Sequence, residues 1–478
     1  MIFDDAAQYR SSGFAPQVAI VGAGPAGITV ARRLAKARIP CALLDAGGRV
    51  YSQESQDVYR GTTIGDPYFD LDATRLRYLG GTSGHWTGWT RFLDPHDFEK
   101  RDWIPNSGWP IGREAIEPHF ASAREILGLP RFLDDLPISD DISRIHLIRS
   151  DPVRFGAKYA GELADSALIA VVLNTYATDL AAENGRVTAA NINSNRRPAG
   201  RIDAPRFVVA TGGIENSRLL LWSNETSSHP VVPEAAALGR YWMEHPEFEG
   251  GDIYVEDTGA YRAEVDGWAY FAPTPAAMRL NRLMNFHAVI MPRRYTGGKR
   301  LLAELACTAP AAAQWLAAKA GKNLSCGARV GLAWEQAPLP ENRVTLSSDQ
   351  RDYAGIPRVE LHWKKGELER RTLLEGLKLF GATLATKDIG RIRIDEWIRN
   401  GGDYPTNQEM AGHHHMGGTR MSTDPTTGVV DGDCKVHGME NLYVAGSSIF
   451  TTSGYANPTA TIVAFADRLG AHLAETRA

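Results

Sequence analysis

Three consecutive histidines, His413 to His415, and an asparagine followed by a proline, Asn457 and Pro458, are residues whose types and spacing suit catalysis. A histidine has an unperturbed pKa of about 6.5, so it can take a proton from a substrate near neutral pH. An asparagine amide can hold a substrate oxygen while remaining uncharged. These two residue types together suit a reaction in which a base takes a proton from a substrate oxygen that an uncharged amide holds.

The three histidines could instead bind a metal or pack in the core. In a β-strand successive side chains face opposite sides of the sheet, so at most His413 and His415 would share a side. No neighbouring carboxylate or cysteine completes a set of metal ligands. We therefore expect no metal site and favour a catalytic role, with structural packing as the alternative.

A glycine turn near the amino end is expected to bind a cofactor. A strand over residues 17–21 runs into Gly22, Gly24 and Gly27, and a helix is predicted over residues 28–37. The first glycine of such a turn permits the tight bend, the second lets the backbone approach a pyrophosphate, and the third lets the helix pack closely on the strand. This arrangement is typical of dinucleotide-binding folds.

A second strand, over residues 41–44, ends at Asp45, which lies 21 residues beyond Gly24. That distance is close to the spacing of about 20 residues expected for an acid that binds the adenosine ribose. The strand, helix and acid together favour dinucleotide binding over a merely glycine-rich turn. An NAD(P)-dependent reductase built on the same turn is less favoured because no second nucleotide fold is apparent in the sequence.

Further short strands follow along the chain, and the one that ends in ATGG is expected to bring backbone amides to the same ligand. They are predicted over residues 168–174, 186–193, 206–210 and 441–445. The third of them ends in Ala210, Thr211 and Gly212, and the last runs into Gly446 and Ser447. Both strand ends would therefore return the chain to the nucleotide.

A helix is predicted over residues 458–474, with Asn457 as its N-cap and Pro458 as its first residue. Its positive end would face whatever lies beyond the preceding strand.

Between about residues 247 and 400, scattered strands and longer helices indicate a second domain built on an antiparallel sheet. An alanine-rich helix over residues 301–322 is expected to pack in that domain, with a lid or partner-binding helix as the alternative.

The composition bounds the remaining possibilities. The chain has 478 residues, 43% of them hydrophobic and 23% charged, which suits a folded globular protein with roughly three domains or with two large interwoven ones. A net charge of -4 offers no basic surface for nucleic acid or anionic membranes.

The four cysteines (Cys41, Cys307, Cys326 and Cys434) are far apart and are expected to be free thiols. The first residues lack a secretory pattern and the longest apolar run, residues 167–173, is too short to span a bilayer, so a cytoplasmic location is expected.

Taken in order, several segments resemble the glucose-methanol-choline (GMC) flavoprotein oxidoreductases over nearly the whole chain. They are VGAGPAGITVARRL with Asp45, GGTSGHWTG, ATGGIENSRLLL, GRYWMEHP, PENRVTLS, the segment from His414 to Gly418, and NLYVAGSS followed by YANPTATI. The segments HWT, ATGGIENSR and ANPT look most like the pyranose oxidase branch and the catalytic subunits of bacterial sugar dehydrogenases. The chain is shorter than many members of the family.

The resemblance implies a mixed α/β fold and FAD as the cofactor. A Rossmann-like FAD-binding domain over residues 14–96, 155–246 and 405–478 would be interwoven with a substrate-binding domain over residues 97–154 and 247–404. His414, in the family's H-x-x-G motif, would be the catalytic base, and Asn457 its partner. The expected cofactor-binding residues are Gly22, Gly24, Ala26, Gly27, Asp45, Ala46, Gly81, Thr82, Ser83, His85, Thr87, Ala210, Thr211, Gly212, Gly446, Ser447, Asn457, Pro458 and Thr459.

The resemblance also implies a substrate class, a secondary alcohol on a sugar, glycoside or sugar-like polyol that is oxidised to a ketone. Trp86, Trp89, Trp103 and Trp109 cluster near the GGTSGHWTG segment and could stack on a sugar ring, although at least two of them are expected to pack the core. A non-sugar alcohol of a biosynthetic pathway and a non-catalytic flavoprotein remain alternatives. Choline is disfavoured because no carboxylate beside an aromatic cage can be located in the sequence.

The electron acceptor and the mode of FAD attachment stay open. Without a haem motif, electrons would leave to oxygen, a quinone or a separate carrier. His85 would either be joined covalently to the flavin, as the matching histidine of pyranose oxidases is, or pack beside it. The chain could also form an oligomer.

Overall fold

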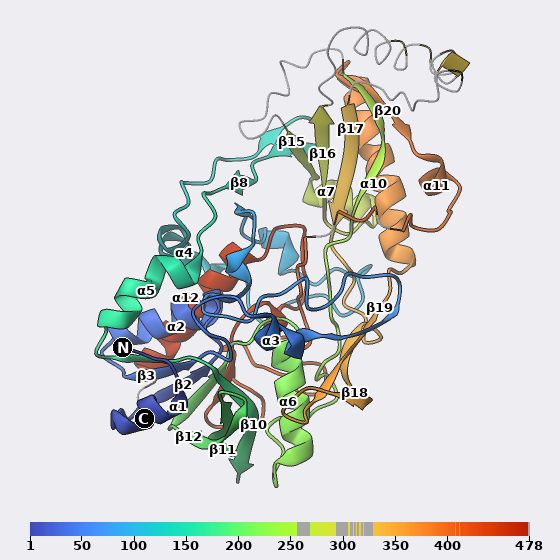
Figure 1. Ribbon diagram of the computed structural model, residues 1–478. Helices are drawn as coiled ribbons and strands as arrows, with labels where there is room; N and C mark the ends of the chain where they lie inside the picture. Colours follow the sequence, from blue (N-terminus) through green and yellow to red (C-terminus); the bar gives the residue numbers. More distant parts are fainter. Residues whose placement is uncertain are drawn as a thin grey trace.

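The computed structural model describes residues 1–255, 268–292, 328–406, 408–410 and 412–476, with six single residues between 292 and 328 (305, 309, 312, 315, 316 and 319) (Figure 1). The helix predicted over residues 301–322 therefore falls almost entirely outside the described residues, as do Cys307 and Cys326. Cys41 and Cys434 are buried free thiols, as predicted.

A six-stranded sheet in which every neighbouring pair is parallel forms the lower left of the molecule in Figure 1. Its strands, in spatial order, are β1 (Ile2–Phe3), β9 (Ile169–Val172), β3 (Cys41–Leu44), β2 (Val18–Val21), β13 (Arg206–Val209) and β21 (Leu442–Val444). The four central strands and β21 are buried, which is why they read in the sequence as short, continuous apolar runs. The strands predicted in these regions are confirmed to within two residues.

Two helices from opposite ends of the chain pack together beside this sheet: α2 (Pro25–Lys36) and α12 (Thr459–Glu475). A Cβ at Gly470 of α12 would lie 2.6 Å from Cβ of Arg33, so the absent side chain permits the close approach of the two helices. Helix α2 begins three residues earlier than predicted, because Pro25 suits a first helical position and Gly24 is the N-cap.

A three-stranded antiparallel sheet lies beside the parallel one and packs on helix α6 (Glu215–Thr226). Its strands are β10 (Thr175–Glu183), β11 (Arg186–Ser194) and β12 (Arg197–Asp203). Strand β10 follows β9 after two residues, so this sheet continues directly from the carboxyl end of a parallel strand.

A seven-stranded antiparallel sheet with helix α10 (Glu367–Thr386) occupies the upper right of Figure 1. Its strands, in spatial order, are β20 (Gly390–Ile394), β14 (Glu247–Val255), β17 (Ala328–Trp334), β16 (Phe286–Pro292), β15 (Ala269–Pro273), β7 (Ile142–Ile145) and β6 (Leu136–Pro137). Apolar residues of the sheet and of α10 form a second core, separate from that of the parallel sheet. The mixed α/β class and the antiparallel second sheet agree with the prediction.

Two strands predicted within the second sheet belong to another one. Strand β18 (Arg343–Arg351) pairs with β19 (Pro357–Trp363), and β19 pairs in parallel with β4 (Gly61–Gly65). A Cβ at Gly61 or Gly65 would lie 2.5 or 2.3 Å from a carbonyl oxygen of β19, so these glycines permit the contact. This sheet joins segments about 300 residues apart.

The remaining elements are short. They are α1 (Ala6–Ser11), α3 (Gln53–Gln56), α4 (Phe120–Leu127), α5 (Phe155–Asp165), α7 (Pro275–Asn281), α11 (Glu396–Arg399), β5 (Trp89–Thr90), β8 (Ile148–Arg149) and the 3-10 turns η1 (Asp57–Tyr59), η2 (Gly81–Gly84), η3 (Pro95–Asp97), η4 (Arg113–Ala115), η5 (Glu117–His119) and η6 (Ser447–Ile449). Across the described residues, every helix is too short or too polar to cross a membrane.

Candidate active site

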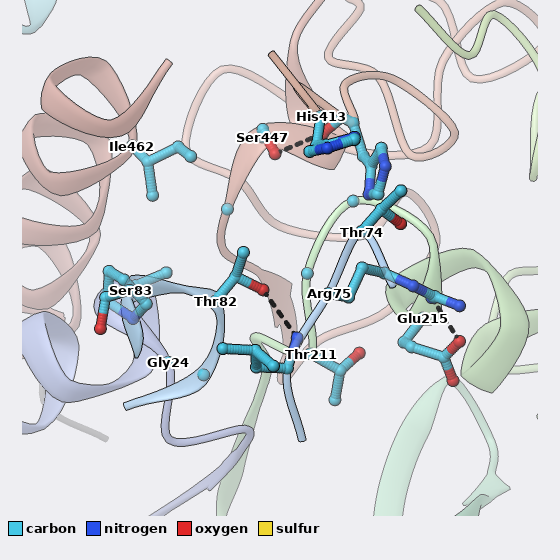
Figure 2. Close-up of a pocket in the computed structure, with 18 of the residues that line it drawn as sticks. Gly24, Thr74, Arg75, Thr82, Ser83, Thr211, Glu215, His413, Ser447 and Ile462 are labelled. Atoms are coloured by element: carbon cyan, nitrogen blue, oxygen red, sulfur yellow. Dashed lines mark hydrogen bonds and ion pairs between the residues drawn. The ribbon is translucent and has the colours of Figure 1, made fainter. Parts of the chain in front are cut away.

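A cavity of about 650 Å³ lies at the carboxyl ends of the parallel strands and extends to the antiparallel sheet. Figure 2 shows part of its wall, with Gly24, Thr211 and Ser447 labelled. Val21 and Leu44, the last residues of β2 and β3, line one part of it, whereas Glu247, His287 and Ala333, on β14, β16 and β17, line the other. The carboxyl edge of a parallel sheet is where open α/β folds bind their ligands. The cavity thus offers a cofactor region beside one sheet and a substrate region beside the other.

Three glycines on the cavity wall follow three adjacent parallel strands. A Cβ at Gly24 or Gly212 would meet no protein atom within 4 Å, and one at Gly446 would meet only a side-chain nitrogen of Asn216 at 3.9 Å. The open space in front of these backbones is what a pyrophosphate at the amino end of α2 requires. Gly22 and Gly27 differ, because a Cβ at either would strike backbone oxygen within 2.3 Å. Those two glycines therefore close the turn and the helix–strand contact.

Asp45 lies at the end of β3, and only 6% of its surface is exposed. Its Oδ1 accepts a hydrogen bond from the backbone N–H of Gly47 at 2.8 Å. Burial raises the pKa of Asp45 to about 6, although that hydrogen bond and the nearby Arg77 guanidinium oppose the rise. Arg77 is itself buried and also lines the cavity, and its Nη2 has no hydrogen-bond partner in the protein. Both groups are available to the ribose end of a dinucleotide.

The turn over residues 80–87 forms another part of the wall. A Cβ at Gly81 would lie 3.3 Å from Cα of Gly24, so this turn packs on the glycine turn after β2. The Ser83 hydroxyl donates to the Gly80 carbonyl at 2.6 Å and accepts from the Phe155 N–H at 3.0 Å, so its side chain holds the turn in place. His85 is exposed on the cavity wall, and its attachment to a flavin stays a prediction.

His414 lies on the cavity wall between two side chains. Its Nε2 is 3.2 Å from Nδ2 of Asn457, and its Nδ1 is 2.9 Å from Nδ1 of His245. Burial lowers the pKa of His414 well below its ordinary value, and the neighbouring histidines, His245 above all, lower it further. A neutral imidazole in contact with an amide is the arrangement expected of a base that receives an alcohol proton.

The other two histidines of the run have different surroundings. His415 is buried, its Nε2 is 3.0 Å from the Tyr68 hydroxyl, and its ring packs against Trp242. The His413 ring contacts Phe69 edge-on at the cavity wall, and its Nδ1 is buried without a partner. Residues 413–415 are irregular and His413 has a φ of 53°, so the alternation of side chains along a β-strand does not apply to them. Each of the three side chains therefore reaches a separate environment.

Comparisons with known proteins agree with this geometry. A family described as GMC oxidoreductase matches residues 338–466, and one described as NAD(P)-binding Rossmann-like domain matches residues 20–73. The fructose dehydrogenase large subunit of Gluconobacter japonicus is 27% identical over 315 residues, covering 61% of this chain and 51% of its own length. The 2-methyl-1,2-propanediol dehydrogenase of Mycolicibacterium austroafricanum is 24% identical, covering 95% of this chain and 94% of its own.

The chain has the same fold as pyridoxine 4-oxidase from Mesorbium loti, whose crystal structure matches it with a TM-score of 0.59. The match covers 97% of this chain and 100% of the pyridoxine 4-oxidase chain, and the two sequences are 16% identical. The carboxyl-terminal part of the chain is thus similar to the GMC oxidoreductases. The glycine wall and Asp45 fit FAD as the cofactor. The chain spans about half the length of the fructose dehydrogenase subunit.

The cavity brings together nearly all the residues predicted to bind FAD. The residues on its wall are Gly22, Gly24, Ala26, Asp45, Ala46, Gly81, Thr82, Ser83, His85, Thr87, Ala210, Thr211, Gly212, Gly446, Ser447, Asn457, Pro458 and Thr459, together with His414. Gly27 is not on the wall, because it packs the helix against the turn. Their individual roles stay predictions.

The predicted N-cap of the last helix is wrong. Helix α12 begins at Thr459 and its N-cap is Pro458, without a side-chain capping bond. Asn457 precedes the cap, and its amide contacts His414 instead of a backbone N–H of the helix. The same asparagine that reads as a local start signal thus has a distant partner.

Sequence reasoning missed several residues of the substrate region: His245, Glu247, Trp268, His287 and Tyr455 all line the cavity. A signal for the first two was present in GRYWMEHP and the Glu247 that follows it. Of the four tryptophans singled out, Trp86 and Trp89 line the cavity, whereas the other two belong to the apolar cores, as expected of at least two.

Proposed function

We propose that the enzyme oxidises a secondary alcohol of a sugar, glycoside or sugar-like polyol to the ketone, with His414 as the base that takes the hydroxyl proton. The observation that carries this proposal is the contact of His414 Nε2 with the Asn457 amide at the cavity wall, 3.2 Å apart. FAD, when bound, supplies the acceptor for the hydride. Asn457 would hold the alcohol oxygen, and His414 would keep the removed proton on Nε2.

The walls of the substrate region suit a sugar. Trp89, Trp268 and Tyr455 provide aromatic surface for the C–H faces of a ring, and His287 provides a polar group for its hydroxyls. His287 Nδ1 and the Tyr455 hydroxyl are buried without a hydrogen-bond partner in the protein. Such unpaired groups favour a polyhydroxylated ligand, because each gains a partner when that ligand binds.

A cationic alcohol such as choline is the second candidate, because the structure supplies the carboxyl that the sequence did not reveal. Glu247 lines the cavity together with Trp89 and Trp268. Burial alone raises the pKa of Glu247 to about 7. When the Glu247 carboxyl is ionised, it would attract a cation. When it is protonated, it would donate a hydrogen bond to a sugar hydroxyl.

The products distinguish the two candidates. Sugars, glycosides, polyols and choline would each be incubated with the holoenzyme in the presence of air or of a quinone, and the products identified by mass spectrometry and NMR. We expect a ketone from a ring secondary alcohol. Exclusive oxidation of choline or of simple primary alcohols to aldehydes would contradict the sugar proposal, and the additive that sustains turnover would identify the class of electron acceptor.

The pH dependence of flavin reduction follows from the lowered pKa of His414. A base with a lowered pKa stays unprotonated, and therefore active, as the pH falls through the ordinary histidine value of about 6.5. We expect the rate constant of flavin reduction, measured by anaerobic stopped-flow absorbance, to stay level from about pH 9 to about pH 6.5 and to fall only in more acidic solution. A loss of rate on acidification that is centred above about pH 6.5 would contradict the assigned environment of His414.

A further inference from the structure

His245 lies directly behind His414, on the side away from Asn457. It follows GRYWME in the sequence, is 2% exposed, and comes from a segment 169 residues distant from His414. The two rings meet nearly at right angles, with an interplanar angle of 79°, and their Nδ1 atoms are 2.9 Å apart. Only one of these two nitrogens can carry the shared proton, because a hydrogen bond needs a donor and an acceptor.

The Ser453 carbonyl decides which nitrogen carries that proton. His245 Nε2 is 3.3 Å from this oxygen, which can only accept, so Nε2 of His245 bears a hydrogen. Burial lowers the pKa of His245 to about 4, so the ring is neutral and its Nδ1 has a free lone pair. His414 must then donate from Nδ1, which leaves its Nε2 unprotonated toward Asn457 and the cavity.

A buried carboxylate fixes the two histidine segments relative to each other. Glu244 Oε1 accepts the backbone N–H of His245 at 2.8 Å and that of His414 at 2.6 Å, and Tyr68 donates its hydroxyl to Oε2. Burial raises the pKa of Glu244 to about 7, although these hydrogen bonds oppose the rise. Glu244 therefore holds the two backbone segments together, and the Ser453 carbonyl determines the tautomers of the two rings.

We propose that His245 is a positioning residue that holds the proton of His414 on Nδ1, so that Nε2 is presented as the base. This inference rests on the proposed role of His414. When His414 takes the alcohol proton on Nε2, its Nδ1–H bond stays directed at His245, so the charge that forms on the His414 ring has an acceptor beside it. No electron is exchanged between the two rings, and the proton passes from His414 Nε2 to solvent after hydride transfer.

Two substitutions separate this role from mere packing. In His245→Asn, the amide oxygen can replace Nδ1 as the acceptor, whereas His245→Leu has similar bulk and no acceptor. We expect His245→Leu to slow flavin reduction by about 10- to 100-fold, less than the full 10²- to 10⁴-fold reach of a general base, because the base itself remains. His245→Asn is expected to stay within about threefold of wild type, since it keeps the acceptor.

The matched control is His437→Leu. His437 Nε2 also contacts a backbone carbonyl, that of Ser422 at 3.0 Å, but His437 does not line the cavity. The rate of flavin reduction should be unchanged in this variant. Equal losses in His245→Leu and His245→Asn, with FAD absorbance and thermal unfolding as in wild type, would overturn the proposal.

The tautomer itself can be observed without turnover. In ¹⁵N-histidine-labelled holoenzyme, the His414 ring is assigned as the signal missing from His414→Ala, and two-bond ¹H–¹⁵N spectra report which nitrogen is protonated. We expect Nδ1–H and a bare Nε2 in wild type and in His245→Asn, and a proton on Nε2 in His245→Leu. Protonated Nε2 in wild type would overturn the inference even if a variant failed to fold. An active His414→Ala enzyme would instead refute the proposed function and leave the tautomer result standing.

Discussion

Replacement of His414 by alanine is expected to slow flavin reduction by about 10²- to 10⁴-fold while FAD stays bound, because only the acceptor of the alcohol proton is removed. The structure favours retention of FAD, since the glycines and Asp45 that fit the cofactor belong to β2, β3, β13 and β21 and the turns after them. Anaerobic stopped-flow absorbance measures the reduction, and the spectrum of the resting protein reports the bound flavin.

The neighbouring histidine is the control for this variant. His413 also lines the cavity, but its ring contacts Phe69, so His413→Ala should cost less than about tenfold. A large loss in His413→Ala with a harmless His414→Ala would transfer the role to His413. Loss of the folded state in His414→Ala would support a structural role for this histidine.

Replacement of Gly24 by valine is expected to give a folded, colourless protein. Gly24 has a φ of -81°, which any residue can adopt, and its Cβ would meet no protein atom within 4 Å. The added isopropyl group would instead occupy the space that the pyrophosphate needs. Absorbance in the flavin bands measures the FAD bound to the purified protein, and circular dichroism measures whether the protein is folded.

Gly161→Val provides a matched comparison. Gly161 lies in α5, where a Cβ also meets no protein atom within 4 Å, but it is not on the cavity wall. This variant should be as yellow as wild type. If Gly24→Val also bound a full complement of FAD, the assignment of the glycine turn to the pyrophosphate would be wrong.

The local parts of the fold could be predicted from the sequence. The strand, glycine turn and helix around Gly24 lie within about 20 residues, and Gly27 packs against Gly22 of the same turn. The strand that ends before Gly446 could be predicted for the same reason, since its apolar residues and the glycine after it are contiguous. Burial on both faces makes such strands continuous apolar runs.

Contacts between distant segments could not be predicted. The pairing of β4 with β19 depends on glycines whose partner strand lies about 300 residues away. The contact of His245 with His414 joins two loops whose sequences show no common pattern. Asn457 illustrates the same limit, because its capping signal is local whereas its observed partner, His414, is brought to it by the tertiary fold.

The central claim is that the cavity holds an FAD that an alcohol reduces, and an anaerobic titration of the purified yellow protein tests it most directly. We expect one or more sugars or glycosides to bleach the flavin absorbance completely in wild type, with the corresponding ketone formed in an amount equal to the enzyme. A yellow protein that no alcohol bleaches would contradict the account, as would a colourless protein that binds NAD(P) in place of FAD.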